Sequence, residues 1–181
     1  MNKKFNKIGS FTLIELILVL ILLGVIYSIL LPKFQIKSNK DKSNIELTNL
    51  KEYLLNNFDF QNEIKFSCIS KDFSCYVFTD RVLVEDFKIE KFFEVEPEVY
   101  KYNKDLENYD LGKITIEGFT ENLIFEYKIN SDFKSNEFIL DTKNNKVFLF
   151  NSIFDKPLVF ENVYGVIEQI DNNTNEVKGA F

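Results

Sequence analysis

The chain has 181 residues, enough for one ordinary domain or for a small domain with an appendage. Its 45% hydrophobic and 28% charged residues are typical of a folding chain, and the absence of histidine excludes imidazole-based triads and histidine-ligated zinc or iron sites. The net charge of -6 disfavours a protein that coats nucleic acid, and two cysteines can form one disulfide but no four-thiolate metal site.

A short basic segment at the amino terminus is followed by a long apolar run. Three lysines lie in the first ten residues, and from Phe11 to Leu31 the only charged residue is Glu15. As a helix these residues would extend over about 31 Å, which matches the hydrocarbon core of a bilayer. A secretory signal has a shorter apolar region that ends at a small-x-small cleavage site, and this run has no such site. The run therefore predicts a retained transmembrane helix.

The residues around Glu15 follow a specific pattern. The sequence SFTLIEL, which begins at Ser10, resembles the cleavage site of type IV pilins and type II secretion pseudopilins. In that family the residue after the cut is usually Phe, and an acid, a Gly and a Pro follow at fixed spacings. Counted from Phe11, these landmarks are Glu15, Gly24 and Pro32. The resemblance places the scissile bond between Ser10 and Phe11, although the family usually has Gly before the cut.

This resemblance implies a processing and assembly pathway. Prepilin peptidase would remove the leader, the new amino terminus at Phe11 would be N-methylated, and Glu15 would pair with the terminal amine of a neighbouring subunit. Two charges in an apolar environment are tolerated when they are paired, and the loss of either leaves the other uncompensated. Glu15 is therefore expected to be an assembly residue, with Gly24 and Pro32 as helix kinks.

An amphipathic pattern follows Pro32, which should bend the helix. Its apolar residues recur every three or four positions and are Leu47, Leu50, Leu54 and Phe58. A single helix over residues 11–58 would be about 72 Å long. Its second half is expected to pack against a globular domain.

From residue 59 onward the sequence changes to short β-rich runs separated by Asn, Asp, Gly and Lys. The runs predict strands at 76–79, 82–84, 98–102, 113–117, 123–129, 137–141, 146–150 and 157–160, with a hairpin turn at 141–145. The predicted fold is α+β and pilin-like, a long N-terminal helix packed on an antiparallel β-sheet. Its parts are a leader (1–10), a transmembrane half-helix (11–31), an amphipathic half-helix (32–58) and a β-rich globular domain (59–181).

The two cysteines, Cys68 and Cys75, are close in sequence. Because an exported domain lies in an oxidising compartment, a disulfide between them is expected. Closing this short loop would contribute about 2.5 kcal/mol on the chain-entropy estimate. A buried reduced pair is the alternative.

Two acidic segments have a functional and a structural interpretation. The segment Asp171 to Glu176 spaces oxygen ligands like a calcium loop but lacks the usual Gly, so a solvated turn is the alternative. A second run could supply paired acid–base carboxylates, although a solvated face is the simpler interpretation. It contains Glu85, Asp86, Glu90, Glu94, Glu96 and Glu98. No catalytic residue, metal ligand or cofactor is predicted.

The resemblance implies a pseudopilin or minor pilin, because the cysteines precede the predicted sheet instead of lying near the carboxyl end. Such a protein is a structural subunit, not an enzyme, of a short periplasmic filament in a type II secretion or type IV pilus-like machine for protein secretion or DNA uptake. Its implied partners are prepilin peptidase, other pilin or pseudopilin subunits, the inner-membrane assembly platform and the lipid bilayer. It would cross the bacterial inner membrane once, with its leader cytoplasmic and its carboxyl-terminal domain periplasmic or extracellular.

Charge bears on the partners as well. Removal of the three leader lysines leaves 19 basic and 28 acidic residues, a net charge of -9, so direct nucleic-acid binding is not expected. The alternative function is a single-pass, membrane-anchored binding module or adhesin that is not polymerised and that keeps its leader.

Overall fold

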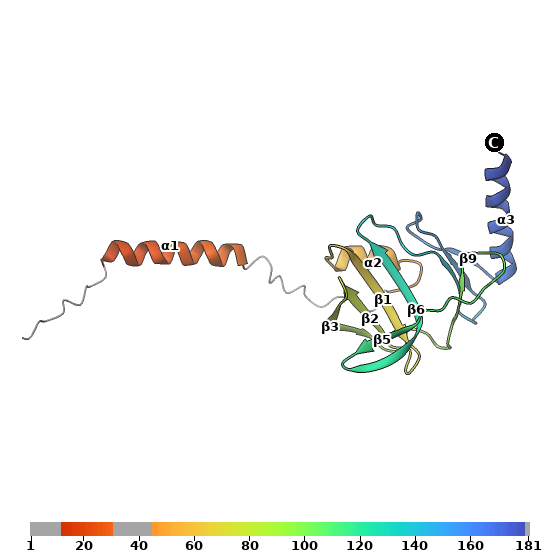
Figure 1. Cartoon of the computed structure of the whole chain (residues 1–181), viewed down its shortest axis with the longest axis horizontal. Helices are drawn as coiled ribbons and strands as arrows, with labels where there is room; N and C mark the ends of the chain where they lie inside the picture. Colours follow the sequence, from red (N-terminus) through yellow and green to blue (C-terminus); the bar gives the residue numbers. More distant parts are fainter. Residues whose placement is uncertain (1–11, 31–44, 180–181) are drawn as a thin grey trace, which may run out of the picture. The chain divides into compact units, whose positions relative to one another are not determined.

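The computed structural model describes residues 12–30 and 45–179 of a chain that divides into two compact units, Met1–Lys40 and Asp41–Phe181 (Figure 1). The first unit contains helix α1 (Leu13–Leu30). The second contains helix α2 (Leu50–Asn57), helix α3 (Val163–Gly179) and, within the described part of the chain, nine strands.

The prediction of a membrane anchor is wrong, because α1 is too short. None of the helices in residues 12–30 and 45–179 is long and apolar enough to cross a membrane. α1 has 18 residues, which rise about 27 Å, whereas a bilayer's hydrocarbon core is about 30 Å thick. The prediction of a single-pass inner-membrane protein is contradicted by this finding.

The predicted continuous helix over residues 11–58 is also wrong. α1 ends at Leu30, and α2 is a separate helix of 8 residues that begins at Leu50. A turn precedes α2: the backbone N–H of Glu46 donates to Oδ1 of Asn49 (2.9 Å), and the backbone N–H of Asn49 donates to the carbonyl oxygen of Glu46 (3.1 Å). These two bonds hold residues 46–49 in a turn, and the helix therefore starts only after Asn49.

The apolar stripe around α2 packs into the core, as expected. Leu50, Leu54 and Phe58 are each at most 4% exposed. The polar residues Glu52 and Asn56 lie on the exposed side. The stripe thus docks a two-turn helix onto the sheets instead of extending the amino-terminal helix.

The larger sheet is antiparallel, with strand order β3-β2-β1-β6-β5. Its strands are β1 (Glu63–Ile69), β2 (Cys75–Thr79), β3 (Val82–Ile89), β5 (Lys113–Ile116) and β6 (Phe119–Asn130). On β1 the buried residues Ile64 and Phe66 alternate with Glu63 and Lys65, which lie on the other face of the sheet. The larger sheet therefore has one face in the core, and its other face carries charged residues beside a small apolar cluster of Ile69, Phe78 and Ile116. We call this second face the polar face.

The smaller sheet is antiparallel, with strand order β4-β7-β8-β9. Its strands are β4 (Glu98–Lys101), β7 (Phe138–Asp141), β8 (Val147–Phe150) and β9 (Leu158–Phe160). β7 and β8 are joined by the predicted turn at 141–145, where the backbone N–H of Lys143 donates to Oδ1 of Asp141 (2.8 Å) and Lys143 and Asn145 have positive φ. All four residues of β8 are buried. Both faces of this sheet must therefore be covered.

One face of β7 and β8 contributes to a core shared with the larger sheet and α2. Phe125 of β6 lies at the centre of this core, with ring centroids 5.5 Å from Phe93, 5.7 Å from Phe138 and 6.3 Å from Phe66. Most of these rings meet edge to face, the arrangement that aromatic quadrupoles favour. Much of the chain's phenylalanine thus fills the interior.

The other face of β7 and β8 is covered by α3. Val166 is fully buried against Ile139 and Leu149. Gly165 allows this approach, because a Cβ at that position would lie 3.0 Å from the ring of Phe160. The sequence analysis missed this helix, whose carboxyl-terminal half is rich in Asn and Asp.

The predicted disulfide between Cys68 and Cys75 is present. The two residues are directly opposite each other on β1 and β2, with their Cα atoms 4.0 Å apart, and both are fully buried. The bridge therefore links the central strand β1 to its neighbour β2 at the base of the loop that joins them.

The predicted strands are confirmed as β2 to β9, but the predicted fold class is wrong. Two antiparallel sheets with three separate helices replace a long helix on one sheet. The strand that the sequence analysis missed, β1, is the central strand of the larger sheet. Its alternation of polar and apolar residues in EIKFSCI was the available signal.

Removal of the disulfide tests its contribution to stability. In the double variant Cys68→Ala and Cys75→Ala, the free energy of unfolding should fall by about 2.5 kcal/mol, because the unfolded chain regains the entropy of an open loop. Urea unfolding followed by tyrosine fluorescence measures this, since the chain has no tryptophan and eight tyrosines. The reduced wild-type protein is the control and should match the variant. A loss below about 1 kcal/mol would contradict the estimate.

Candidate functional site

Glu15 lies in the first turn of α1, where it forms a capping box with Thr12. The backbone N–H and the Oγ1 of Thr12 donate to Oε2 of Glu15, at 3.4 and 3.3 Å. In return the backbone N–H of Glu15 donates to Oγ1 of Thr12 (3.4 Å). The Glu15 side chain thus accepts from the Thr12 amide, which the first turn leaves without a helical partner, whereas the Glu15 amide is shared between Oγ1 and the carbonyl oxygen of Thr12 (3.0 Å). Glu15 fixes where α1 begins.

The sequence analysis missed this structural role of Glu15. Thr12 and Glu15 have the Thr-x-x-Glu spacing that is the signature of a capping box before an apolar run. The analysis considered Glu15 as an acid in an apolar run. The hydrogen bonds from Thr12 to the Glu15 carboxylate use Oε2, so the cap does not engage Oε1.

The surface of α1 is apolar on all sides. From Leu13 to Ile26 every large apolar side chain is between 43% and 77% exposed. Successive residues of a helix point in different directions, so an unbroken run such as Leu16 to Leu23 covers its entire circumference. A helix of this kind is stable in water only when other apolar groups cover it.

The other predicted processing and kink residues are only partly within the described chain. Ser10, Phe11 and Pro32 lie outside the described residues. Gly24 lies within α1, which continues as an α-helix through it, and a Cβ at this position would meet no atom within 4 Å.

The two acidic segments are placed in an α-helix and on an exposed stretch of chain. The segment from Asp171 to Glu176 lies in helix α3, not in a loop, and Nε2 of Gln169 donates to Oδ1 of Asn173 (3.0 Å). The acidic residues of 85–98 are exposed. In residues 12–30 and 45–179, no group of three or more Asp, Glu, Cys or His side chains is placed to hold a metal ion.

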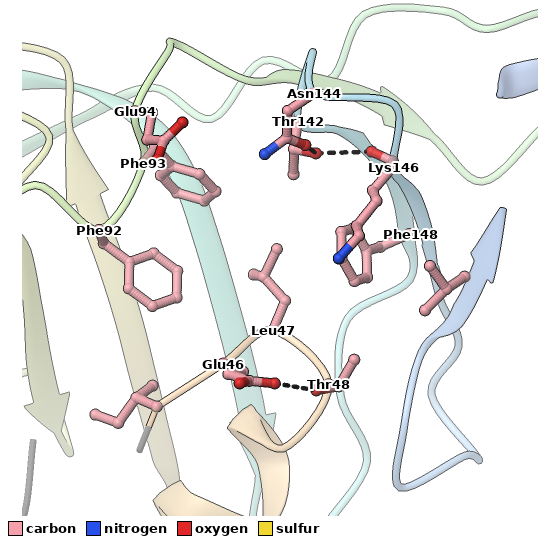
Figure 2. A pocket seen from close by; sticks show the side chains of 12 residues that line it. Glu46, Leu47, Thr48, Phe92, Phe93, Glu94, Thr142, Asn144, Lys146 and Phe148 are labelled. Atoms are coloured by element: carbon pink, nitrogen blue, oxygen red, sulfur yellow. Dashed lines mark hydrogen bonds between the residues drawn. The ribbon is translucent and has the colours of Figure 1, made fainter. Parts of the chain in front are cut away.

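A groove of about 430 Å³ lies between the segment 45–48, the loop after β3 and the β7–β8 hairpin. Figure 2 shows Phe92 and Phe93 on one side, Leu47 from the entering segment, and Phe148 on the opposite side. Hydrogen bonds hold its polar rim, including one from Oγ1 of Thr142 to the carbonyl oxygen of Lys146 (2.7 Å) and one from Oγ1 of Thr48 to Oε2 of Glu46 (3.1 Å).

The charged groups of this groove do not form a catalytic arrangement. Glu46, Glu94 and Lys146 are exposed, and within residues 45–179 no hydrogen bond or ion pair joins any two of these three side chains. A general acid–base pair needs two groups that converge on one reacting atom. The groove is thus a surface feature with an aromatic wall.

A network of charges occupies the polar face of the larger sheet. Lys65 and Lys128 are directly opposite each other on β1 and β6, and Glu63 lies beside them. The Glu63 carboxylate is 2.9 Å from Nζ of Lys128, 3.8 Å from Nζ of Lys65 and 3.6 Å from Nε of Arg81. The carboxylate offsets the repulsion between the two facing lysines. The hydrogen bond from Lys128 and the nearby cations hold the pKa of the Glu63 carboxyl below its ordinary value of 4.5.

Asp80 closes the turn beside this network. Its two carboxylate oxygens accept hydrogen bonds from the backbone N–H groups of Gln61 (2.8 Å), Asn62 (2.6 Å) and Glu63 (3.1 Å). These three amides hold the pKa of the Asp80 carboxyl below its ordinary value. Asp80 thereby joins the β2–β3 turn to the start of β1.

The lowered pKa values predict acid sensitivity. The unfolded chain takes up protons at Glu63 and Asp80 near pH 4, whereas the folded chain resists this, so the free energy of unfolding should fall as the pH drops from about 5 to about 3. Urea unfolding at a series of pH values measures this slope.

A variant of Glu63 measures how much this residue contributes to the dependence of the free energy of unfolding on pH. Glu63→Gln should flatten the slope and cost up to about 1 kcal/mol at pH 7. Glu85→Gln, at an exposed site on β3, is the matched control and should keep the wild-type slope. An unchanged slope in Glu63→Gln would contradict the assignment.

Comparison with known proteins identifies no relative of the chain. It matches no protein-family model, no curated protein and no solved structure.

Proposed function

We propose that the chain is a pilin-like structural subunit that assembles with other subunits through α1. In this proposal a prepilin peptidase cuts between Ser10 and Phe11, and Glu15 of one subunit pairs with the new amine of a neighbour. The proposal is supported by the spacing of Phe11, Glu15, Gly24 and Pro32 and by the apolar surface of α1. The single observation that carries it is the exposed, fully apolar helix with one acid in its first turn.

The distribution of apolar residues on α1 supports assembly of many subunits rather than of two. A two-helix coiled coil needs only a narrow apolar seam, with polar residues on the remaining surface. α1 has no polar face between Leu16 and Leu23. Its burial therefore needs neighbours on several sides, as in the centre of a filament. Complete burial of one Leu or Ile side chain contributes roughly 1.5–3 kcal/mol, so the summed gain is large.

Glu15 would set the axial offset between neighbouring α1 helices, which apolar contacts alone do not determine. Apolar contacts between leucine-rich helices tolerate many axial offsets. A carboxylate surrounded by apolar side chains tolerates only the offset that brings a cation to it, because an unpaired charge is strongly disfavoured there. The amine of a processed Phe11 is a cation at the position that the resemblance implies. Glu15 would thus select one stagger between adjacent subunits.

The role of Glu15 is tested by Glu15→Gln, produced together with a prepilin peptidase and the assembly proteins. Gln also serves in a capping box, so the helix start is preserved while the charge is lost. Incorporation into filaments, measured by shearing and sedimentation, should fall on the order of 100-fold. Glu52→Gln changes the acid in the first turn of α2 and should leave incorporation unchanged. Incorporation of Glu15→Gln into filaments at the wild-type level would refute the proposed pairing.

Processing is tested separately by intact-mass analysis. The mature chain should begin at methylated Phe11, and it should remain uncut when the peptidase is inactive. An unpolymerised binding module that keeps its leader would instead begin at Met1 in both preparations.

A further inference from the structure

The polar face of the larger sheet has a second feature besides the charge network around Glu63. Two hollows, of about 360 and 520 Å³, both include Arg81 of the β2–β3 turn. The first also includes Lys65 of β1 and Lys113 of β5, and the second includes Lys128 of β6. Four cations from different elements thus meet on one face of a protein whose net charge is negative. We call these residues the basic hollow.

The carboxylates near the basic hollow do not neutralise it. Glu63 pairs with three of the cations, and Glu126 lies 3.8 Å from Lys65. The Asp80 carboxylate accepts hydrogen bonds from neutral backbone amides and keeps its negative charge, so three carboxylates face the four cations of the two hollows. Lys113 is exposed and forms no ion pair in the described part of the chain, and the Arg81 side chain is 88% exposed. A positive charge therefore remains available to an incoming anion.

One wall of the basic hollow is apolar. Leu111, Ile114 and Leu123 line the first hollow and are only half-buried, and Phe78 lies beneath them. The site therefore suits a segment that presents carboxylates together with an apolar side chain. A simple inorganic anion would leave this wall uncovered.

The same chain carries such a segment. Glu94 and Glu96 flank Val95, which is 55% exposed, and Pro97 follows. Glu94 and Glu96 are exposed and form no ion pair within residues 45–179. Figure 2 shows Glu94 on the loop that follows Phe93. Pro97 disfavours helical backbone at Glu96, and the side chains of Glu94, Val95 and Glu96 are exposed, whereas Pro97 is buried.

We propose that the basic hollow of one subunit binds the Glu94–Pro97 segment of a second copy of this chain. Glu94 and Glu96 would face Arg81 and Lys113, and Val95 would cover the apolar wall. Opposite charges would set the orientation and the burial of Val95 would add affinity. This inference rests on the proposed function, since it names a contact between subunits of the same filament.

In this proposal each interface contains one hollow and one acidic segment, which makes the contact heterologous. Such a contact leaves one hollow and one segment free at the ends of every dimer, so it continues to add subunits, into a ring if the rotation between subunits closes and into an open helical array if it does not. The open array is the symmetry that a helical filament requires. The interaction would connect the globular units of subunits whose α1 helices pack separately.

Cross-linking in the full chain tests the contact. One preparation carries Lys113→Cys, a second carries Glu96→Cys, and the two are mixed with a short bismaleimide. Cys68 and Cys75 are already bonded and cannot react. Cross-linked dimers should exceed by about tenfold those from the control mixture of Lys113→Cys with Glu85→Cys, which places the thiol elsewhere in the acidic run. High salt should reduce the yield. A chain with both Lys113→Cys and Glu96→Cys should give a ladder of multimers.

Charge reversal provides a second measurement. Arg81→Glu with Lys113→Glu should abolish association with wild-type acidic segments, and mixing with Glu94→Lys, Glu96→Lys should restore it. Circular dichroism checks that each variant is folded. Equal cross-linking in the test and control mixtures, or no restoration in folded variants, would overturn the inference.

Filament formation, observed by electron microscopy of the same samples, distinguishes this inference from the proposed function. Filaments without the specific cross-link would leave the proposed function standing and refute the inference. Specific cross-links without filaments would support the contact and count against the filament role.

Discussion

The fold of the globular unit depends on the burial of both sheets and α2 in one aromatic core. Phe125 contacts rings from the loop after β3, from β1 and from β7, so elements far apart in sequence share one packing centre. Aromatic side chains bury the largest areas of any residue type, which allows a few of them to join two sheets. The smaller sheet then needs a second cover, and Val166 of α3 supplies it. Without α3, the apolar residues of β8 would face water.

α1 presents the opposite situation, because its apolar side chains have no cover in the described unit to which it belongs. Val166 is fully buried in the globular unit, whereas Leu13 and Ile14 of α1 are more than 70% exposed. The helix of the first unit thus has the apolar composition of a protein core, but its side chains are exposed. In the proposed function, neighbouring subunits would supply the missing cover.

The sequence predicted local structure better than architecture. Period-two alternation marks strands wherever one face is polar, so most strands were identified. The pairing of Cys68 and Cys75 was predicted from the oxidising compartment expected for an exported domain. The number of sheets was not predictable, because β7 and β8 are apolar on both faces and give no sign of which layer they join. α3 was missed because its Asn-rich second half has low helix propensity. The stripe on α2 indicated a helix correctly but not where that helix begins, which the turn at Asn49 decides.

Glu15 illustrates how a site residue can be identified with only part of its role. The capping box holds Oε2 of its carboxylate toward Thr12, on the amino-terminal side of the helix. That is the side from which a terminal amine would have to approach. The hydrogen bonds also restrict the rotamers of Glu15, so less side-chain entropy remains to be lost when an ion pair forms. In the proposed function, a cap that stabilises the isolated helix would also orient the same carboxylate for pairing. One residue can satisfy both requirements because a carboxylate has two oxygens and the cap uses one.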